Sequence, residues 1–265
     1  MNYDDLYLRV EQRVTCPDLI TSVLHRELRY VDGFLDKGEF GRIECLKLIS
    51  SLSAIGDWRI SEGIVDLRHG RGAERLLEGY RWCGLYVETG SRLSPVTRFC
   101  DHAALCAATG ALLGATDSYQ ANFSRLMNEG SLAPAYVEEL AWFVTWLLQS
   151  NDHPESSIDK IARRLGRYAE VVEHWDSDDL KQVIGELCEW RADMSQTSSG
   201  VYYNEPFCAF PAEVLLIART REMQGLSPAM PSHSLLPDFL QNIPAPSEPE
   251  DVRLAQLMEI LPKVN

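Results

Sequence analysis

Acidic side chains are concentrated in one short segment of this 265-residue chain. Residues 170–193 hold eight acidic residues against two basic ones, Lys181 and Arg191. A surface with that charge repels the phosphates of nucleic acid and attracts cationic partners from a distance. The segment therefore favours a protein that binds a basic protein and does not bind nucleic acid. Its acids are Glu170, Glu173, Asp176, Asp178, Asp179, Glu186, Glu189 and Asp193.

The apolar residues of the same segment indicate that its charge faces outward. Leu180, Ile184 and Leu187 recur at helical spacing, so they predict a buried stripe on a helix that ends near Met194. Aromatic side chains close to such a surface could act as binding anchors. An ordinary solvated helix face is the alternative interpretation of the acidic residues. The candidate partner-binding residues are Glu170, Glu173, Asp176, Asp178, Asp179, Glu186, Glu189, Tyr202 and Tyr203.

A second set of residues could instead bind a metal ion. Asp66 and His69 lie three positions apart, which places them on one face of a helix, and Asp101 adjoins His102. Such carboxylate and imidazole groups allow a helical metal-dependent hydrolase as an alternative function. The chain has no H-E-x-x-H helix and no C-x-x-C pair among its seven cysteines, so we expect no metal, no cofactor and buried, reduced thiols.

Other sequence signals argue against enzymatic activity and against a membrane. The chain has neither a P-loop, nor a strand-linked G-x-G-x-x-G, nor a G-x-S-x-G nucleophile elbow, although a catalytic triad that assembles in space would leave no local trace. The first residues include acids and no apolar h-region, and no apolar stretch reaches bilayer length, so we expect neither a signal peptide nor a membrane span. The net charge is −14, of which residues 133–265 carry −11. We therefore expect a cytoplasmic protein that is not an enzyme.

The spacing of apolar residues is helical along nearly the whole chain. It predicts an all-α fold of about ten to twelve helices packed as antiparallel hairpins. Separate helices are expected at 40–52 and 57–67, and a small-residue helix at 96–113 is expected to be central. Residues 1–242 are predicted to form a single all-α domain. Residues 243–265 are predicted to be a Pro-rich linker and a C-terminal amphipathic helix at 251–261.

Residues 206–240 resemble the closing part of the all-helical immunity proteins of bacterial polymorphic toxins, in particular the immunity protein forty-nine family. The shared pattern is an apolar helix that begins near a proline, ends at Gly225-Leu226 and is followed by the L-P-x-x-L run from Leu236 to Leu240. The small-residue helix and the segment that begins at Trp58 are similar in style.

The resemblance implies a non-enzymatic cytosolic antitoxin. Such a protein binds a cognate effector toxin delivered by contact-dependent or type VI secretion and blocks its active site or its fold. An acidic protein suits a basic toxin, such as a nuclease with a cationic cleft. A helical scaffold that binds peptides is a third possibility, and the oligomeric state is left open.

Overall fold

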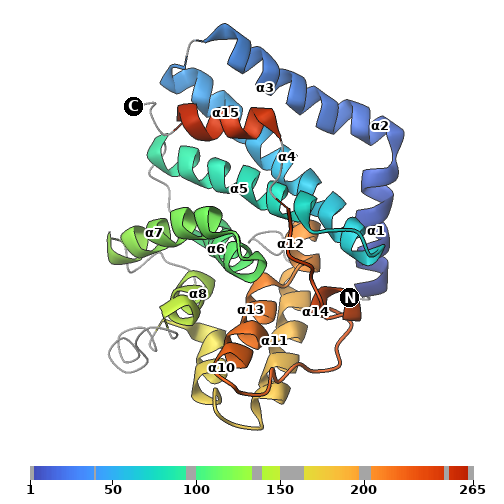
Figure 1. Ribbon diagram of the computed structural model, residues 1–265, viewed down its shortest axis with the longest axis vertical. Coiled ribbons are helices and arrows are strands. Elements are labelled where there is room, and N and C mark those ends of the chain that lie inside the picture. Colours follow the sequence, from blue (N-terminus) through green and yellow to red (C-terminus); the bar gives the residue numbers. More distant parts are fainter. Residues whose placement is uncertain are drawn as a thin grey trace.

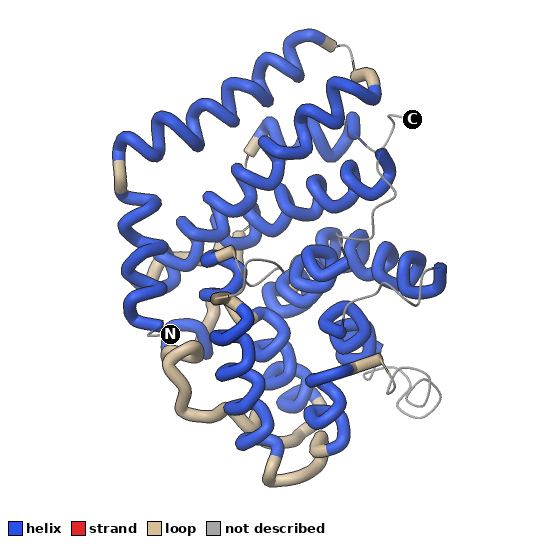
Figure 2. Tube along the Cα trace, turned by 180° about the vertical axis from the view of Figure 1, so that it is seen from behind, coloured by secondary structure: helices blue, strands red, loops and turns tan. Residues whose placement is uncertain are grey.

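The computed structural model describes residues 3–38, 40–93, 100–132, 139–149, 164–196, 204–247 and 251–261. Within these ranges the regular structure is helical and contains no strand, which confirms the predicted all-α fold (Figure 2). Ten α-helices in the described ranges have nine or more residues, and short helical turns connect some of them.

The N-terminal half is built around a long helical hairpin (Figure 1). A single 27-residue helix, α4, stands where the sequence predicted two, and it runs back along α5 with extensive contact. The shorter helices α1 to α3 lie along one side of this hairpin. The elements are α1 (Tyr3–Thr15), α2 (Pro17–Leu19), the π-helical turn η1 (Ile20–Leu24), α3 (His25–Lys37), α4 (Arg42–Arg68) and α5 (Glu74–Leu93).

Glycines set the close approach of α4 and α5. A Cβ atom on Gly63 would lie 2.4 Å from the backbone nitrogen of Leu76, and one on Gly79 would lie 2.5 Å from that of Ile60. Real side chains cannot come so near to backbone atoms, so any larger residue would push the two helices apart. The α4–α5 hairpin is therefore a tightly fitted and rigid part of the molecule.

The small-residue helix α6 is central, as its composition predicted. Its alanines from Ala103 to Ala108 are buried, and it contacts α5, α7, α8 and the later helix α13 (Ala212–Met223). Gly110 brings it close to α7, because a Cβ there would lie 2.8 Å from the backbone nitrogen of Tyr119. These elements are α6 (Cys100–Leu113), α7 (Thr116–Leu132) and α8 (Glu139–Gln149).

Of the C-terminal elements, α10, α11 and α13 form the lower part of the molecule in Figure 1, whereas α15 lies in its upper part. Gly225, with a φ of 75°, ends α13 as predicted, and the short helix α12 precedes α13. The elements are the 3-10 turn η3 (Gly166–Tyr168), α10 (Ala169–Glu173), α11 (Leu180–Met194), α12 (Glu205–Ala209), α13 (Ala212–Met223), α14 (Asp238–Gln241) and α15 (Val252–Ile260).

The last helix, α15, packs against the N-terminal half. The Asp251 side chain accepts hydrogen bonds from the first backbone N–H groups of α15, which begins the helix as an N-cap. Leu254 and Leu257 are buried, and Arg253 pairs with Asp32 of α3 at 2.5 Å. The predicted boundary between residues 242 and 243 thus precedes a tail that returns to α5 and α3.

Candidate partner-binding surface

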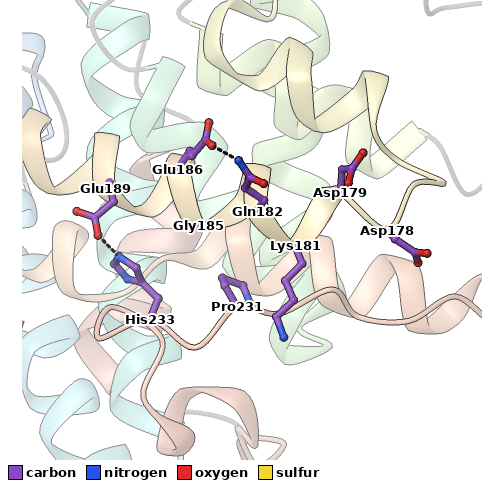
Figure 3. A pocket seen from close by; sticks show the side chains of 9 residues that line it. All are labelled: Asp178, Asp179, Lys181, Gln182, Gly185, Glu186, Glu189, Pro231 and His233. Atoms are coloured by element: carbon purple, nitrogen blue, oxygen red, sulfur yellow. Dashed lines mark hydrogen bonds and ion pairs between the residues drawn. The ribbon is translucent and has the colours of Figure 1, made fainter.

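All seven acidic residues of the candidate set are exposed. They lie on α10, on the turn that follows it and on α11, so one continuous stretch of chain displays them. Four of them are drawn in Figure 3, around the solvent side of α11. We call this set the acidic face: Glu170, Glu173, Asp176, Asp178, Asp179, Glu186 and Glu189.

Helix α11 separates charge from apolar surface as its sequence predicted. Leu180, Ile184 and Leu187 are buried on the inner side. Asp179, Gln182, Glu186 and Glu189 follow one another at intervals of three or four residues and are exposed. Burial of the apolar stripe therefore holds the carboxylates in water.

Few of these carboxylates have partners within the described residues. Glu189 is the one member that meets a basic side chain at ion-pair distance there, through His233 at 2.9 Å. Glu186 accepts a hydrogen bond of 2.9 Å from the amide of Gln182. In the described part of the chain, no Lys or Arg side chain forms a salt bridge with the acidic face, so its negative charge is projected outward.

The contact with His233 leaves the charge of Glu189 in place. The Nδ1 atom of His233 accepts a hydrogen bond of 3.0 Å from the backbone N–H of Leu235, so the ring proton is placed on Nε2. Nε2 then donates to the Glu189 carboxylate at 2.9 Å. We infer a neutral imidazole that bonds to a carboxylate, which fixes the 231–235 segment beside α11 without neutralising Glu189.

One of the two basic residues of segment 170–193 does not reach the surface. Arg191 is fully buried, pairs with the carboxylate of Glu213 on α13, and donates to the carbonyl of Phe207 at 2.6 Å. Buried charges are tolerated when they are paired and hydrogen-bonded. This network ties α11 to α12 and α13, so the acidic face lies on a rigid support and Lys181 is the exposed basic residue within it.

An open groove of about 570 Å³ runs between α11 and the segment around Pro231 (Figure 3). Gly185 leaves space there, since a Cβ atom on it would lie only in ordinary contact, 3.9 Å from the Cβ of Pro231. The sequence did not single out Gln182, Gly185, Pro231 or His233 as site residues. No local signal could have found the last two, because more than forty residues separate them from this part of α11.

The aromatic residues near the acidic face serve mainly as structure. Trp175 is buried and packs against Trp146, with ring centroids 4.9 Å apart. Its Nε1 donates a hydrogen bond of 2.9 Å to the side-chain oxygen of Gln224. Trp190 is half-buried and meets the ring of Tyr168 edge-on. The two predicted anchors Tyr202 and Tyr203 lie outside the described residues.

The candidate metal ligands have separate partners. Asp66 pairs with Arg71 at 2.8 Å, whereas His69 contacts Glu11 at 2.9 Å. His102 packs among aromatic rings, and its ring centroid lies 5.2 Å from that of Phe207. Across the described residues, no group of three or more His, Cys, Asp or Glu side chains could hold a metal ion.

Asp57 on α4 is a half-buried acid with a buried carboxyl oxygen, and the sequence did not single it out. Its Oδ2 accepts a hydrogen bond of 2.5 Å from Asn204, while its Oδ1 has no hydrogen-bond partner within the described residues. Burial raises the pKa of Asp57 to about 6. Burial also lowers the pKa of His102 to about 4. Both side chains lie near Tyr86, whose ring centroid is 5.7 Å from that of the His102 ring.

Among the described helices, none has the length and apolar character needed to cross a lipid bilayer. Comparison of the chain with protein-family models, with curated proteins and with solved structures found no match.

Proposed function

We propose that this chain is an immunity protein, a cytoplasmic antitoxin that binds and neutralises a cognate basic effector toxin. The toxin is envisaged as a nuclease delivered by type VI secretion, and the acidic face as the surface that meets it. The observation that carries the proposal is the outward display of seven carboxylates that have no Lys or Arg salt bridge within the described residues. Such a potential accelerates the encounter with a cationic partner and opposes wrong ones.

The rigidity of the support favours binding over other uses of the charge. Arg191 and Glu213 connect α11 to α13, and the bond from His233 to Glu189 fixes the neighbouring segment. A preorganised surface loses little conformational entropy when its partner arrives. The stretch that resembles immunity proteins, residues 206–240, includes α13, most of α12 and α14, and the groove wall beside the acidic face.

The two alternatives have less support. A metal-dependent hydrolase would need its ligands together, yet Asp66 and His69 are engaged with Arg71 and Glu11. A peptide-binding scaffold differs from an antitoxin in its partner alone, so a screen of partners separates the two. The natural first candidate is the product of the adjacent gene.

The test compares two double variants of equal charge. Asp179→Lys with Glu186→Lys alters the acidic face, whereas Asp18→Lys with Asp36→Lys alters exposed acids of α2 and α3 at the far end of the molecule. Each pair changes the net charge from −14 to −10. Association with the adjacent-gene product is measured by stopped-flow fluorescence at low and at high salt.

We expect the acidic-face variant to associate about tenfold more slowly at low salt, with little change in the control and convergence of the two at high salt. Equal rates for both variants at low salt would remove the acidic face from the mechanism. Absence of binding by the unaltered protein to the adjacent-gene product and to other cationic toxin domains would refute the antitoxin function itself.

A further inference from the structure

A second groove, of about 500 Å³, lies between the end of α6, α13 and residues 228–245. Its lining is mixed, because polar groups share it with the apolar side chains of Leu112, Leu113, Leu215, Met230, Leu240 and Ile243. The volume falls within the range of small-molecule sites. It lies beside the acidic groove, because residues 228–230 line one and residues 231–233 the other.

Two opposite charges stand at the edge of this second groove. Arg219 and Glu222 both line it, both are exposed, and they are three positions apart on α13. Side chains with that spacing are neighbours on one helix face, with Cβ atoms about 5–6 Å apart. They nevertheless form no salt bridge with each other, and the described residues offer neither of them another ion-pair partner. A ligand could satisfy both.

The end of α6 adds partial negative charge to the same place. The helix ends at Leu113, followed by Gly114 with a φ of 71°, and both residues line the groove. The carbonyl end of a helix favours a cation. An ammonium group near Glu222 and the α6 terminus, together with a carboxylate near Arg219, would match these charges.

The wall of the second groove is held in a constrained backbone conformation. Ala229 has a φ of 55°, a backbone angle that residues other than glycine rarely adopt. Its neighbours Pro228 and Met230 line the groove. The preceding turn is fixed by Arg221, whose Nε donates to the carbonyl of Ser227 at 2.6 Å. Such conformations persist where surrounding contacts enforce them, which indicates a preformed wall.

We propose that the second groove binds a small zwitterion with apolar side chains, such as an apolar dipeptide. Its carboxylate pairs with Arg219, its ammonium group lies near Glu222 and the α6 terminus, and its side chains contact the apolar part of the lining. This site is independent of the acidic face and of the antitoxin function.

Three related ligands test the two charge contacts. Leucyl-leucine carries both charges, N-acetyl-leucyl-leucine lacks the ammonium group, and leucyl-leucine amide lacks the carboxylate. Binding to the full chain is measured by NMR titration of the protein amides. We expect saturable binding of leucyl-leucine and an affinity about tenfold lower for each blocked form, which corresponds to about 1.4 kcal/mol.

Variants assign each contact to a side chain. Arg219→Gln should abolish the preference for leucyl-leucine over its amide and leave the preference over the acetylated form. Glu222→Gln should do the reverse. Ala218→Phe fills the groove and should abolish binding of all three ligands, with Ala218→Leu as a milder second variant if the larger side chain prevents folding.

The acidic-face variant, Asp179→Lys with Glu186→Lys, is the control and should bind leucyl-leucine as the unaltered protein does. The proposal is overturned if leucyl-leucine shows no saturable binding at millimolar concentrations. It is equally overturned if both blocked forms bind as tightly as leucyl-leucine, or if binding survives both Ala218 substitutions in folded protein.

Discussion

Two half-buried residues, Asp57 and His102, are expected to drive the stability of the fold in opposite directions over one pH range. The fold raises the pKa of Asp57 from 3.8 to about 6, mainly by burial, with Asn204 and Arg13 opposing. The stabilisation from this group is therefore full below about pH 4 and is lost as the pH rises through 6. The fold lowers the pKa of His102 from 6.5 to about 4, again by burial. That stabilisation is full above pH 6.5 and is lost as the pH falls through 4.

The two effects are of similar size. Each shift is roughly two pKa units, and one unit corresponds to about 1.4 kcal/mol, so each group changes the free energy of unfolding by about 3 kcal/mol. Because the signs are opposite, the contributions largely cancel in the unaltered protein between pH 4 and 6.5. Removal of either group should expose the pH dependence of the other.

The variants are Asp57→Asn and His102→Gln. An asparagine at position 57 keeps an oxygen for the hydrogen bond from Asn204 and cannot ionise. Urea unfolding is followed by circular dichroism at several pH values from 4 to 7. The free energy of unfolding of Asp57→Asn, relative to that of the unaltered protein, should increase by up to about 3 kcal/mol as the pH rises. That of His102→Gln should increase by a similar amount as the pH falls.

Differences between variant and unaltered protein isolate one group, because all other titrating groups are shared. The exposed Asp36 supplies the control, through Asp36→Asn. A difference for Asp57→Asn that is no steeper with pH than that for Asp36→Asn would refute the burial of this carboxyl group. A difference that rises with falling pH for Asp57→Asn would reverse the sign and refute the reasoning.

Two further predictions concern packing and can be measured by the same unfolding assay. Arg191→Met leaves the carboxylate of Glu213 buried without its partner and should lower the free energy of unfolding by about 3–5 kcal/mol. The added change Glu213→Leu removes that carboxylate and should restore much of the lost stability. Gly79→Ala places a Cβ 2.5 Å from the backbone nitrogen of Ile60 and should cost about 1–3 kcal/mol. Its control, Gly33→Ala in α3, meets no atom within 4 Å and should stabilise by about 0.5–1 kcal/mol, so similar effects of both changes would contradict the close helix packing.

The sequence alone determined the features that depend on nearby residues. Helix formation and the inward or outward direction of side chains follow from spacing within a few turns. That is why the outward acidic residues of α11, the end of α13 at Gly225 and a C-terminal helix over residues 251–261 could be predicted. The same reasoning predicted a central α6 from its small residues.

The tertiary structure alone decided which groups meet and which are buried. Lys181 and Arg191 are both basic residues of the same helix. Arg191 can nevertheless be buried, because it forms a salt bridge with Glu213 and a hydrogen bond with the carbonyl of Phe207. Likewise, the groove beside α11 needs Pro231 and His233 from a distant part of the chain. Burial, ion pairing and pKa shifts depend on neighbours that are remote in sequence, and local spacing carries no information about them.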